Sequence, residues 1–139
     1  MSESGEIHRT PREVSESYWA AECRRDVDAV VEHFHADGTY EVPDGQLRRG
    51  HEAIRPAYEE HMRLFPGLEV NIVREFPLGD RSALEFAAVA TDPAGVRYRI
   101  RGVNVVHVRD GKYVSVRSYE DAPTPEWVSE SGQLKAPGA

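Results

Sequence analysis

The sequence predicts an α+β fold, in which three N-terminal helices pack on one face of a curved, mainly antiparallel sheet and enclose a pocket. In the first half of the chain, apolar residues recur at helical spacing, whereas beyond Leu68 they alternate with polar residues. Three turn signals divide this second half into four strands; they are Leu78-Gly79-Asp80, Asp92-Pro93-Ala94-Gly95 and Arg109-Asp110-Gly111-Lys112. Helices followed by strands, without regular alternation, are typical of α+β domains.

Two helices are predicted at the start of the chain. Thr10-Pro11-Arg12-Glu13 combines a capping box with a proline at the first helical position, so the first helix should begin there and run to about Cys23. Asp26 is suited to cap a second helix. We expect Phe34 on the apolar face of this helix, and Asp37-Gly38 to end it.

A short strand and a third helix complete the first half. The strand is predicted over residues 39–42, and the helix runs from His51 to about Leu64, where Pro66-Gly67 closes it. Residues 1–10 and 122–139 are rich in proline, glycine, serine and charge, and we expect both to be flexible tails. The folded domain is therefore predicted to span residues 11–121.

The composition excludes several classes of partner. Hydrophobic residues make up 40% of the 139 residues, which is typical of a globular domain. The net charge of -7 argues against nucleic acid or an anionic membrane surface, because each phosphate contact needs a cation. A lone cysteine, Cys23, precludes an intrachain disulfide, and we found neither a membrane span nor a signal peptide, so a cytoplasmic protein is expected.

The strand over residues 97–109 indicates which side chains face the helices. One parity carries Tyr98, Ile100, Gly102, Asn104, Val106 and Val108, and the other carries all four arginines of the strand. Asn104 is the only amide on the apolar side, and a buried amide is costly unless it is paired. Its partner is either a bound ligand or a neighbouring strand.

The last strand places a carboxylate near the predicted pocket. Val114, Val116, Ser118 and Glu120 share its inner parity. Partial burial would raise the pKa of Glu120 and suit it to general acid or base catalysis. The alternative is a solvated charge at the rim. No histidine and cysteine spacing fits a metal site, so neither a metal nor another cofactor is predicted.

Several short sequence segments resemble those of the SnoaL-like families in the nuclear-transport-factor-two-like superfamily, which include polyketide cyclases and ketosteroid isomerase-like enzymes. The segments are Tyr18-Trp19-Ala20-Ala21, Asp26-Val27-Asp28-Ala29-Val30, Ala36-Asp37-Gly38-Thr39, Arg49-Gly50-His51-Glu52-Ala53-Ile54, Arg101-Gly102-Val103-Asn104-Val105-Val106, Asp110-Gly111-Lys112 and Arg117-Ser118-Tyr119-Glu120-Asp121. The resemblance implies a cone-shaped fold and a homodimer. It covers about residues 14–121.

The resemblance also implies roles for individual residues. Tyr18 matches the helix-one tyrosine that donates a hydrogen bond to the enolate oxygen in ketosteroid isomerases, and Asn104 matches their second donor. Val42 stands where those enzymes have the catalytic aspartate, which leaves Glu120 as the favoured base, with Asp44 and Asp121 as alternatives. The side chains predicted to contact substrate are Trp19, His35, Tyr40, Val42, Tyr58, Met62, Phe86, Tyr98, Val106 and Ser118.

Two functional interpretations remain open. In the first, the chain is an enzyme that carries out cofactor-free acid/base chemistry, by aldol-type cyclisation or isomerisation, on a polyketide-like or cyclic ketone. In the second, it is a ligand-binding or dimerisation module, or a related hydrolase or dehydratase. Outward Val103, Val105 and His107 favour a homodimer, and Trp127 is a candidate to cover the pocket mouth or to pack on a second copy.

Overall fold

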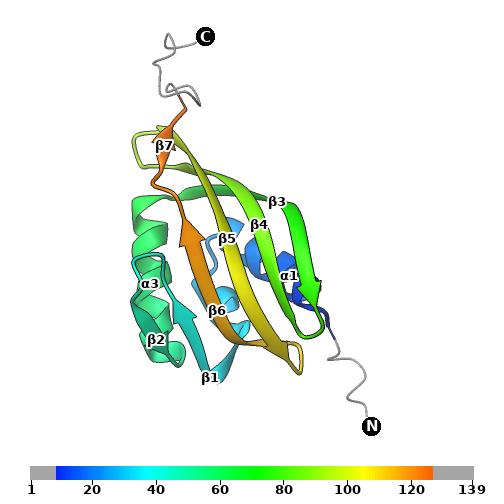
Figure 1. The fold of residues 1–139 in the computed structure, drawn as a ribbon. Helices are drawn as coiled ribbons and strands as arrows, with labels where there is room; N and C mark the ends of the chain where they lie inside the picture. Colours follow the sequence, from blue (N-terminus) through cyan, green and yellow to red (C-terminus); the bar gives the residue numbers. More distant parts are fainter. Residues whose placement is uncertain (1–8, 127–139) are drawn as a thin grey trace.

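The computed structural model describes residues 9–126, which form three helices against one face of a curved sheet (Figure 1). The helices are α1 (Pro11–Cys23), α2 (Val27–Glu32) and α3 (His51–Leu64). The strands are β1 (Phe34–Glu41), β2 (Leu47–Arg49), β3 (Gly67–Leu78), β4 (Arg81–Thr91), β5 (Arg97–Arg109), β6 (Lys112–Glu120) and β7 (Thr124–Pro125). Most of the two predicted tails, and Trp127 with them, lie outside the described residues.

The sheet combines the predicted meander with one parallel pair. Its order is β2-β1-β6-β5-β4-β3. The four long strands β3 to β6 pair antiparallel in sequence order, as predicted. β1 pairs with β6 in parallel, a long-range contact that the sequence did not indicate. Residues 124–125, which we expected in a tail, pair with β5 instead.

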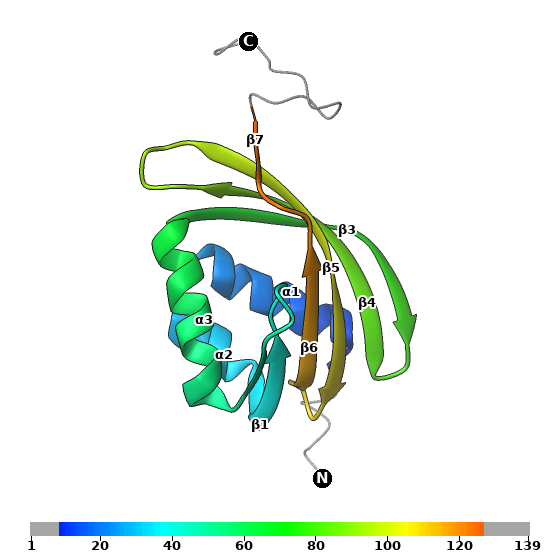
Figure 2. The same ribbon diagram turned by 60° about the vertical axis from the view of Figure 1, so that its left-hand side comes forward.

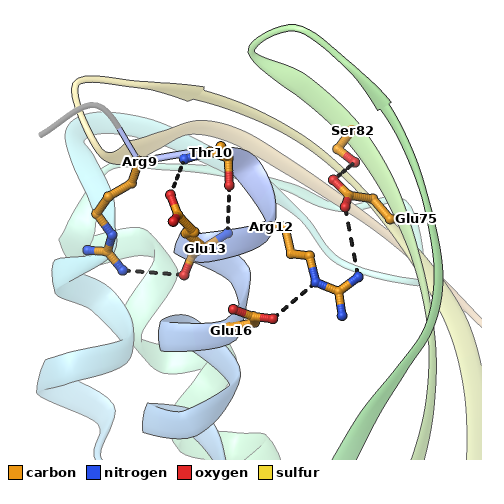
Figure 3. Close-up of polar contacts among 7 residues, drawn as sticks. All are labelled: Arg9, Thr10, Arg12, Glu13, Glu16, Glu75 and Ser82. Atoms are coloured by element: carbon orange, nitrogen blue, oxygen red, sulfur yellow. Dashed lines mark hydrogen bonds and ion pairs between the residues drawn. The ribbon is translucent and has the colours of Figure 1, made fainter.

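The N-terminus of α1 is fixed by its own cap and by contacts to the β3–β4 hairpin (Figure 3). Thr10 and Glu13 form the predicted capping box, with Thr10 Oγ1 accepting from Glu13 N at 3.1 Å and Glu13 Oε1 accepting from Thr10 N at 2.9 Å. Arg12 Nη1 lies 3.9 Å from Glu75 Oε1, and Ser82 Oγ donates to Glu75 Oε2 at 2.8 Å. These contacts hold α1 across the inner face of the sheet.

The prediction for the second helix was wrong at its end. Asp26 caps α2 as expected, accepting from Ala29 N at 3.1 Å, but the helix ends at Glu32 and Phe34 already belongs to β1. Tyr113 N of β6 donates to His33 O at 2.8 Å, so the backbone joins the sheet at this point. A sheet contact to a strand far along the chain overrides the local helical spacing.

A bulge changes the parity of β6 near its start. His107 pairs with Ser115 and Val108 pairs with Tyr113, which leaves Val114 as the extra residue. Tyr113 is therefore fully buried, whereas Val114, predicted to face inward, is only half-buried. Beyond the bulge the predicted parity holds.

The helices lie against the concave face of the sheet (Figure 2). Buried side chains from the helices and the strands form the core between them. On β5 the alternation is as predicted, with Ile100, Asn104, Val106 and Val108 buried. Gly102 lies beneath the ring of Phe86, where an added Cβ would come within 2.7 Å of Phe86 Cζ. The added Cβ would also lie 2.4 Å from the backbone oxygen of Tyr119, so a side chain there would disturb both the ring and the pairing of β5 with β6. Among the helices of the described residues, none is both long and apolar enough to cross a membrane.

Candidate active site

A cavity of about 150 Å³ lies between the helices and the inner face of the sheet. It is lined by Tyr18, Trp19 and Glu22 of α1; Tyr40, Val42 and Pro43 at the end of β1; Ala57, Tyr58 and His61 of α3; and Leu68, Val70, Phe86, Ala88, Ile100, Asn104, Ser118 and Glu120 of the sheet. Most of these side chains are apolar or aromatic. The few polar groups therefore define where a ligand can be bound by hydrogen bonds.

Nine of the residues predicted for the site line this cavity. They are Tyr18, Trp19, Tyr40, Val42, Tyr58, Phe86, Asn104, Ser118 and Glu120. They come from two helices and four strands that are distant in sequence. The fold thus brings together most of the residues selected for the pocket.

The two alternative aspartates lie away from the cavity. Asp44 is exposed in the turn after β1, where its Oδ1 accepts from Gln46 N at 2.9 Å. Asp121 follows Glu120 and points to the opposite side of the sheet, because consecutive residues of a strand alternate in direction. Its carboxylate accepts from Arg101 N at 2.8 Å and from Arg101 Nε at 3.2 Å. Neither aspartate is positioned to act as a base in this pocket.

Four predicted substrate contacts also lie outside the lining. His35 Nε2 is 2.6 Å from Arg109 O, at the far end of β1. Tyr98 donates to Asp92 Oδ2 at 3.3 Å, near the β4–β5 turn. Val106 is buried in the core and Met62 packs against it, and neither lines the cavity.

Glu22 is the main site residue that sequence reasoning missed. It lies one helical turn after Tyr18, so both side chains project from the same face of α1. Glu22 is only 8% exposed. Burial raises its pKa to about 7; the Arg25 cation opposes this effect and Glu120 adds to it. A carboxylate that titrates near neutrality can both take up and release a proton at physiological pH.

Arg25 and His61 lie next to Glu22 at the C-terminal ends of α1 and α3. Arg25 Nη2 is 3.2 Å from His61 Nδ1, and Glu22 Oε2 is 4.0 Å from the same nitrogen. Desolvation, with the Arg25 cation adding to it, lowers the pKa of His61 to about 4. His61 is therefore neutral beside a carboxyl group that is ionised in part.

The phenols of Tyr18 and Tyr58 form a hydrogen-bonded pair in the wall of the pocket. The ring of Tyr58 also stacks on that of Tyr40, with centroids 4.9 Å apart. Burial raises the pKa of all three phenols, so all three keep their protons at physiological pH. A hydrogen bond between two hydroxyls uses one proton and leaves the other for a third partner.

Asn104 and Ser118 face the cavity from neighbouring positions of β5 and β6. Asn104 is 3% exposed, and its Oδ1 has no hydrogen-bond partner among residues 9–126. Buried polar atoms of this kind are rare, because an unmade hydrogen bond costs about 1–3 kcal/mol. The site retains this polar atom where a ligand can reach it.

Glu120 lies at the mouth of the cavity rather than inside it. Like Pro43, it is exposed, although both line the cavity. Partial burial, with Asp121 adding to it, raises the pKa of Glu120. Its inward parity agrees with the prediction, but it is more solvated than Glu22. Within the described part of the chain, no three His, Cys, Asp or Glu side chains converge as they would around a metal ion.

Solved structures with the same fold include proteins with different descriptions. A hypothetical protein with a ketosteroid isomerase-like fold from Catenulispora acidiphila DSM 44928, in complex with trimethylamine, is 22% identical, with a TM-score of 0.69 over 80% of this chain and 86% of that one. An LEH-like epoxide hydrolase from M. tuberculosis is 23% identical, with a TM-score of 0.66 over 78% and 80%. The candidate polyketide cyclase IdmH from Streptomyces antibioticus is 19% identical, with a TM-score of 0.71 over 81% and 93%. At these identities the similarity establishes the fold alone.

The family follows from the sequence itself. None of the curated proteins compared with the chain matches it. A family model, described as a SnoaL-like domain, matches residues 15–116. This range runs from the middle of α1 to β6 and includes most of the cavity lining. The chain therefore belongs to the SnoaL-like domain family.

Proposed function

We propose that the chain catalyses cofactor-free proton transfer next to the carbonyl group of a small hydrophobic molecule. Isomerisation and aldol-type cyclisation both begin with this step. The observation that carries the proposal is a carboxyl group, Glu22, buried in an apolar pocket that also presents proton-donating phenols and a buried amide.

In the proposed reaction, Glu22 removes a proton from the carbon next to the carbonyl group. The C–H bonding electrons move into the carbonyl, and its oxygen becomes an enolate that accepts hydrogen bonds from the pocket. Protonated Glu22 then returns the proton to another carbon of the enolate. In the aldol-type alternative, the enolate carbon bonds to a second carbonyl carbon, and the oxygen of that carbonyl takes up the electron pair and receives the proton from Glu22. Glu22 replaces Glu120 as the favoured base because it is the more deeply buried of the two.

Donors for the enolate oxygen are available at two positions. Tyr18, Tyr58 and Tyr40 carry three phenolic protons for two hydroxyl–hydroxyl contacts, so one proton remains to be donated to the enolate oxygen. The phenols stay neutral because their pKa values are raised. The Asn104 amide supplies N–H donors from the sheet. Preorganised donors of this kind act without reorganisation during the reaction.

The size of the cavity bounds the reacting part of the substrate. A volume of about 150 Å³ is close to that of an engineered protein cavity that binds one benzene ring. The proposed substrate is therefore a monocyclic or comparably small carbonyl compound, or a larger molecule whose remainder extends past Glu120 and Pro43. This is smaller than the polycyclic members of the predicted substrate class.

The proposal is tested by deuterium exchange of α-protons in a panel of monocyclic and polycyclic ketones, followed by NMR in D₂O. Binding is measured in parallel by isothermal calorimetry. A matched variant, Ala57→Leu, fills the cavity and should abolish both signals. If the wild type exchanges α-protons faster than buffer does and Ala57→Leu does not, the result supports an enzyme that acts in this cavity. Binding without exchange, for every compound that binds, would identify a binding module instead.

We further propose that the chain forms a homodimer through the outer face of the sheet. Phe76, Ala83 and Val105 lie side by side on β3, β4 and β5, and Phe76 is 62% exposed. Exposed apolar residues in adjacent positions favour a partner surface.

Val105→Glu is expected to shift the protein to monomers, because a buried carboxylate in a two-fold contact would lie near its own copy. Sedimentation equilibrium measures this change. Leu64→Glu is the matched control, since Leu64 is 45% exposed but belongs to α3. A wild-type protein that is monomeric at micromolar concentration would refute the dimer.

A further inference from the structure

We infer that Arg25 holds His61 as a neutral imidazole with its proton on Nε2, and that this Nε2–H group donates a hydrogen bond to the ligand. The site would therefore select molecules with an acceptor oxygen beside Glu22. This inference rests on the proposed function of the pocket. It assigns Arg25 as a positioning residue and His61 as a ligand-binding residue.

The contacts of Arg25 fix the position of its guanidinium group. Nε and Nη2 donate to Phe65 O at 3.0 and 2.6 Å, and Nη1 donates to Glu22 O at 2.9 Å. These bonds connect the end of α1 to the end of α3. The backbone of Arg25 has a φ of 60°, a left-handed conformation that is unfavourable for an arginine.

The contact to His61 determines the tautomer of its ring. Arg25 Nη2 lies 3.2 Å from His61 Nδ1. A guanidinium group only donates hydrogen bonds, so Nδ1 must carry a lone pair and the ring proton must be on Nε2. Within residues 9–126, the hydrogen bond made by the His61 ring is the one at Nδ1, and the ring lines the cavity. The Nε2–H group is therefore a donor available to a ligand.

The charged groups around the ring keep it neutral. Desolvation lowers the pKa of His61 most, and the Arg25 cation adds to this effect. Two carboxyl groups line the same cavity, Glu22 of α1 and Glu120 of β6, and a negative charge on either would favour the charged form of His61. The nearby phenols of Tyr18 and Tyr58 are uncharged. A neutral donor polarises a carbonyl without protonating the carboxylate that must act as base.

The first test determines the tautomer by NMR of the full chain labelled with ¹⁵N-histidine. Long-range ¹H–¹⁵N correlations distinguish a protonated from an unprotonated ring nitrogen, and His61→Gln assigns the signals. We expect His61 to hold its proton on Nε2 from pH 5 to pH 8. A proton on Nδ1, or a charged ring at pH 6, would overturn the inference even if the pocket catalyses proton exchange.

The second test removes the guanidinium group. Arg25→Gly suits the left-handed backbone, and Arg25→Leu retains side-chain bulk. In both, the His61 proton should distribute over the two nitrogens, and the pKa of His61 and the pKa of Glu22 should both rise because a nearby cation is lost. Arg24→Leu is the matched control, since Arg24 is 59% exposed and lies 3.9 Å from Asp26. An unchanged tautomer and pH profile in both Arg25 variants would overturn the role of Arg25.

The third test uses a ligand with and without an oxygen. Cyclohexanone should shift the His61 Nε2 signal, whereas methylenecyclohexane, of the same shape, should not. Loss of one hydrogen bond in Arg25→Gly should weaken cyclohexanone binding by about 3- to 10-fold and leave the hydrocarbon unaffected. Equal shifts with both probes would refute selection for oxygen. Failure of catalysis alone would refute only the proposed function, because these signals are measured without turnover.

Discussion

Glu22→Gln is expected to slow α-proton exchange by about 10²–10⁴-fold, the usual contribution of a general base. Glutamine preserves the shape of the side chain but cannot take up a proton. Ligand binding should therefore persist while exchange is lost. In the wild type, the rate should rise with pH around a midpoint of about 7, because the pKa of Glu22 is raised to that value and only the carboxylate is a base.

Two further glutamates serve as controls for this result. Glu16→Gln changes the same residue type on the same helix, outside the cavity, and should have the wild-type rate. Glu120→Gln alters the mouth of the pocket and tests the base that the sequence favoured. If Glu120→Gln loses exchange while Glu22→Gln retains it, the assignment of Glu22 is wrong.

Glu22→Gln is also expected to stabilise the protein against unfolding at alkaline pH. The pKa of Glu22 rises from 4.5 in the unfolded chain to about 7 in the fold, so folding favours the protonated form. This contribution is fully present below pH 4.5 and is lost as the pH rises to about 7. At pH 9 the ionised wild type should unfold more easily than Glu22→Gln by about 3 kcal/mol, whereas near pH 4 the two should be similar.

Urea unfolding of both proteins across the pH range measures this difference. The two proteins must be compared with each other because His61 changes the free energy of unfolding in the opposite direction to Glu22. The pKa of His61 is lowered to about 4, so its contribution to stability is lost as the pH falls. Both proteins contain His61, so its effect largely cancels in the difference. A difference in free energy that does not change between pH 4 and pH 9 would show that Glu22 titrates as an ordinary surface residue.

The sequence was sufficient for the parts of the fold that local rules determine. The capping box at Thr10 and the turn signals of the second half predicted α1 and the four-stranded meander. Phe34 was misassigned because its place in β1 depends on β6, far along the chain. The bulge at Val114 likewise depends on the register between two strands. Such pairings are not visible in local periodicity.

For the site, strand parity and family resemblance brought together Tyr18, Asn104 and Glu120, which all line the cavity. Glu22 was missed because a glutamate near a helix end is normally solvated. The signal that identifies it is the spacing of Val14, Tyr18 and Glu22, each four residues apart and so on one face of α1. Its raised pKa could not be predicted, since it depends on how α3 and the sheet cover that face.

The most direct measurement is a ¹³C NMR titration of the side-chain carboxyl groups, with the Glu22 signal assigned from its absence in Glu22→Gln. It needs neither substrate nor turnover. An acid/base site centred on this residue predicts a midpoint of about 7. A midpoint near 4.5, the ordinary value for a glutamate, would mean that Glu22 is solvated and that the pocket lacks the proposed base.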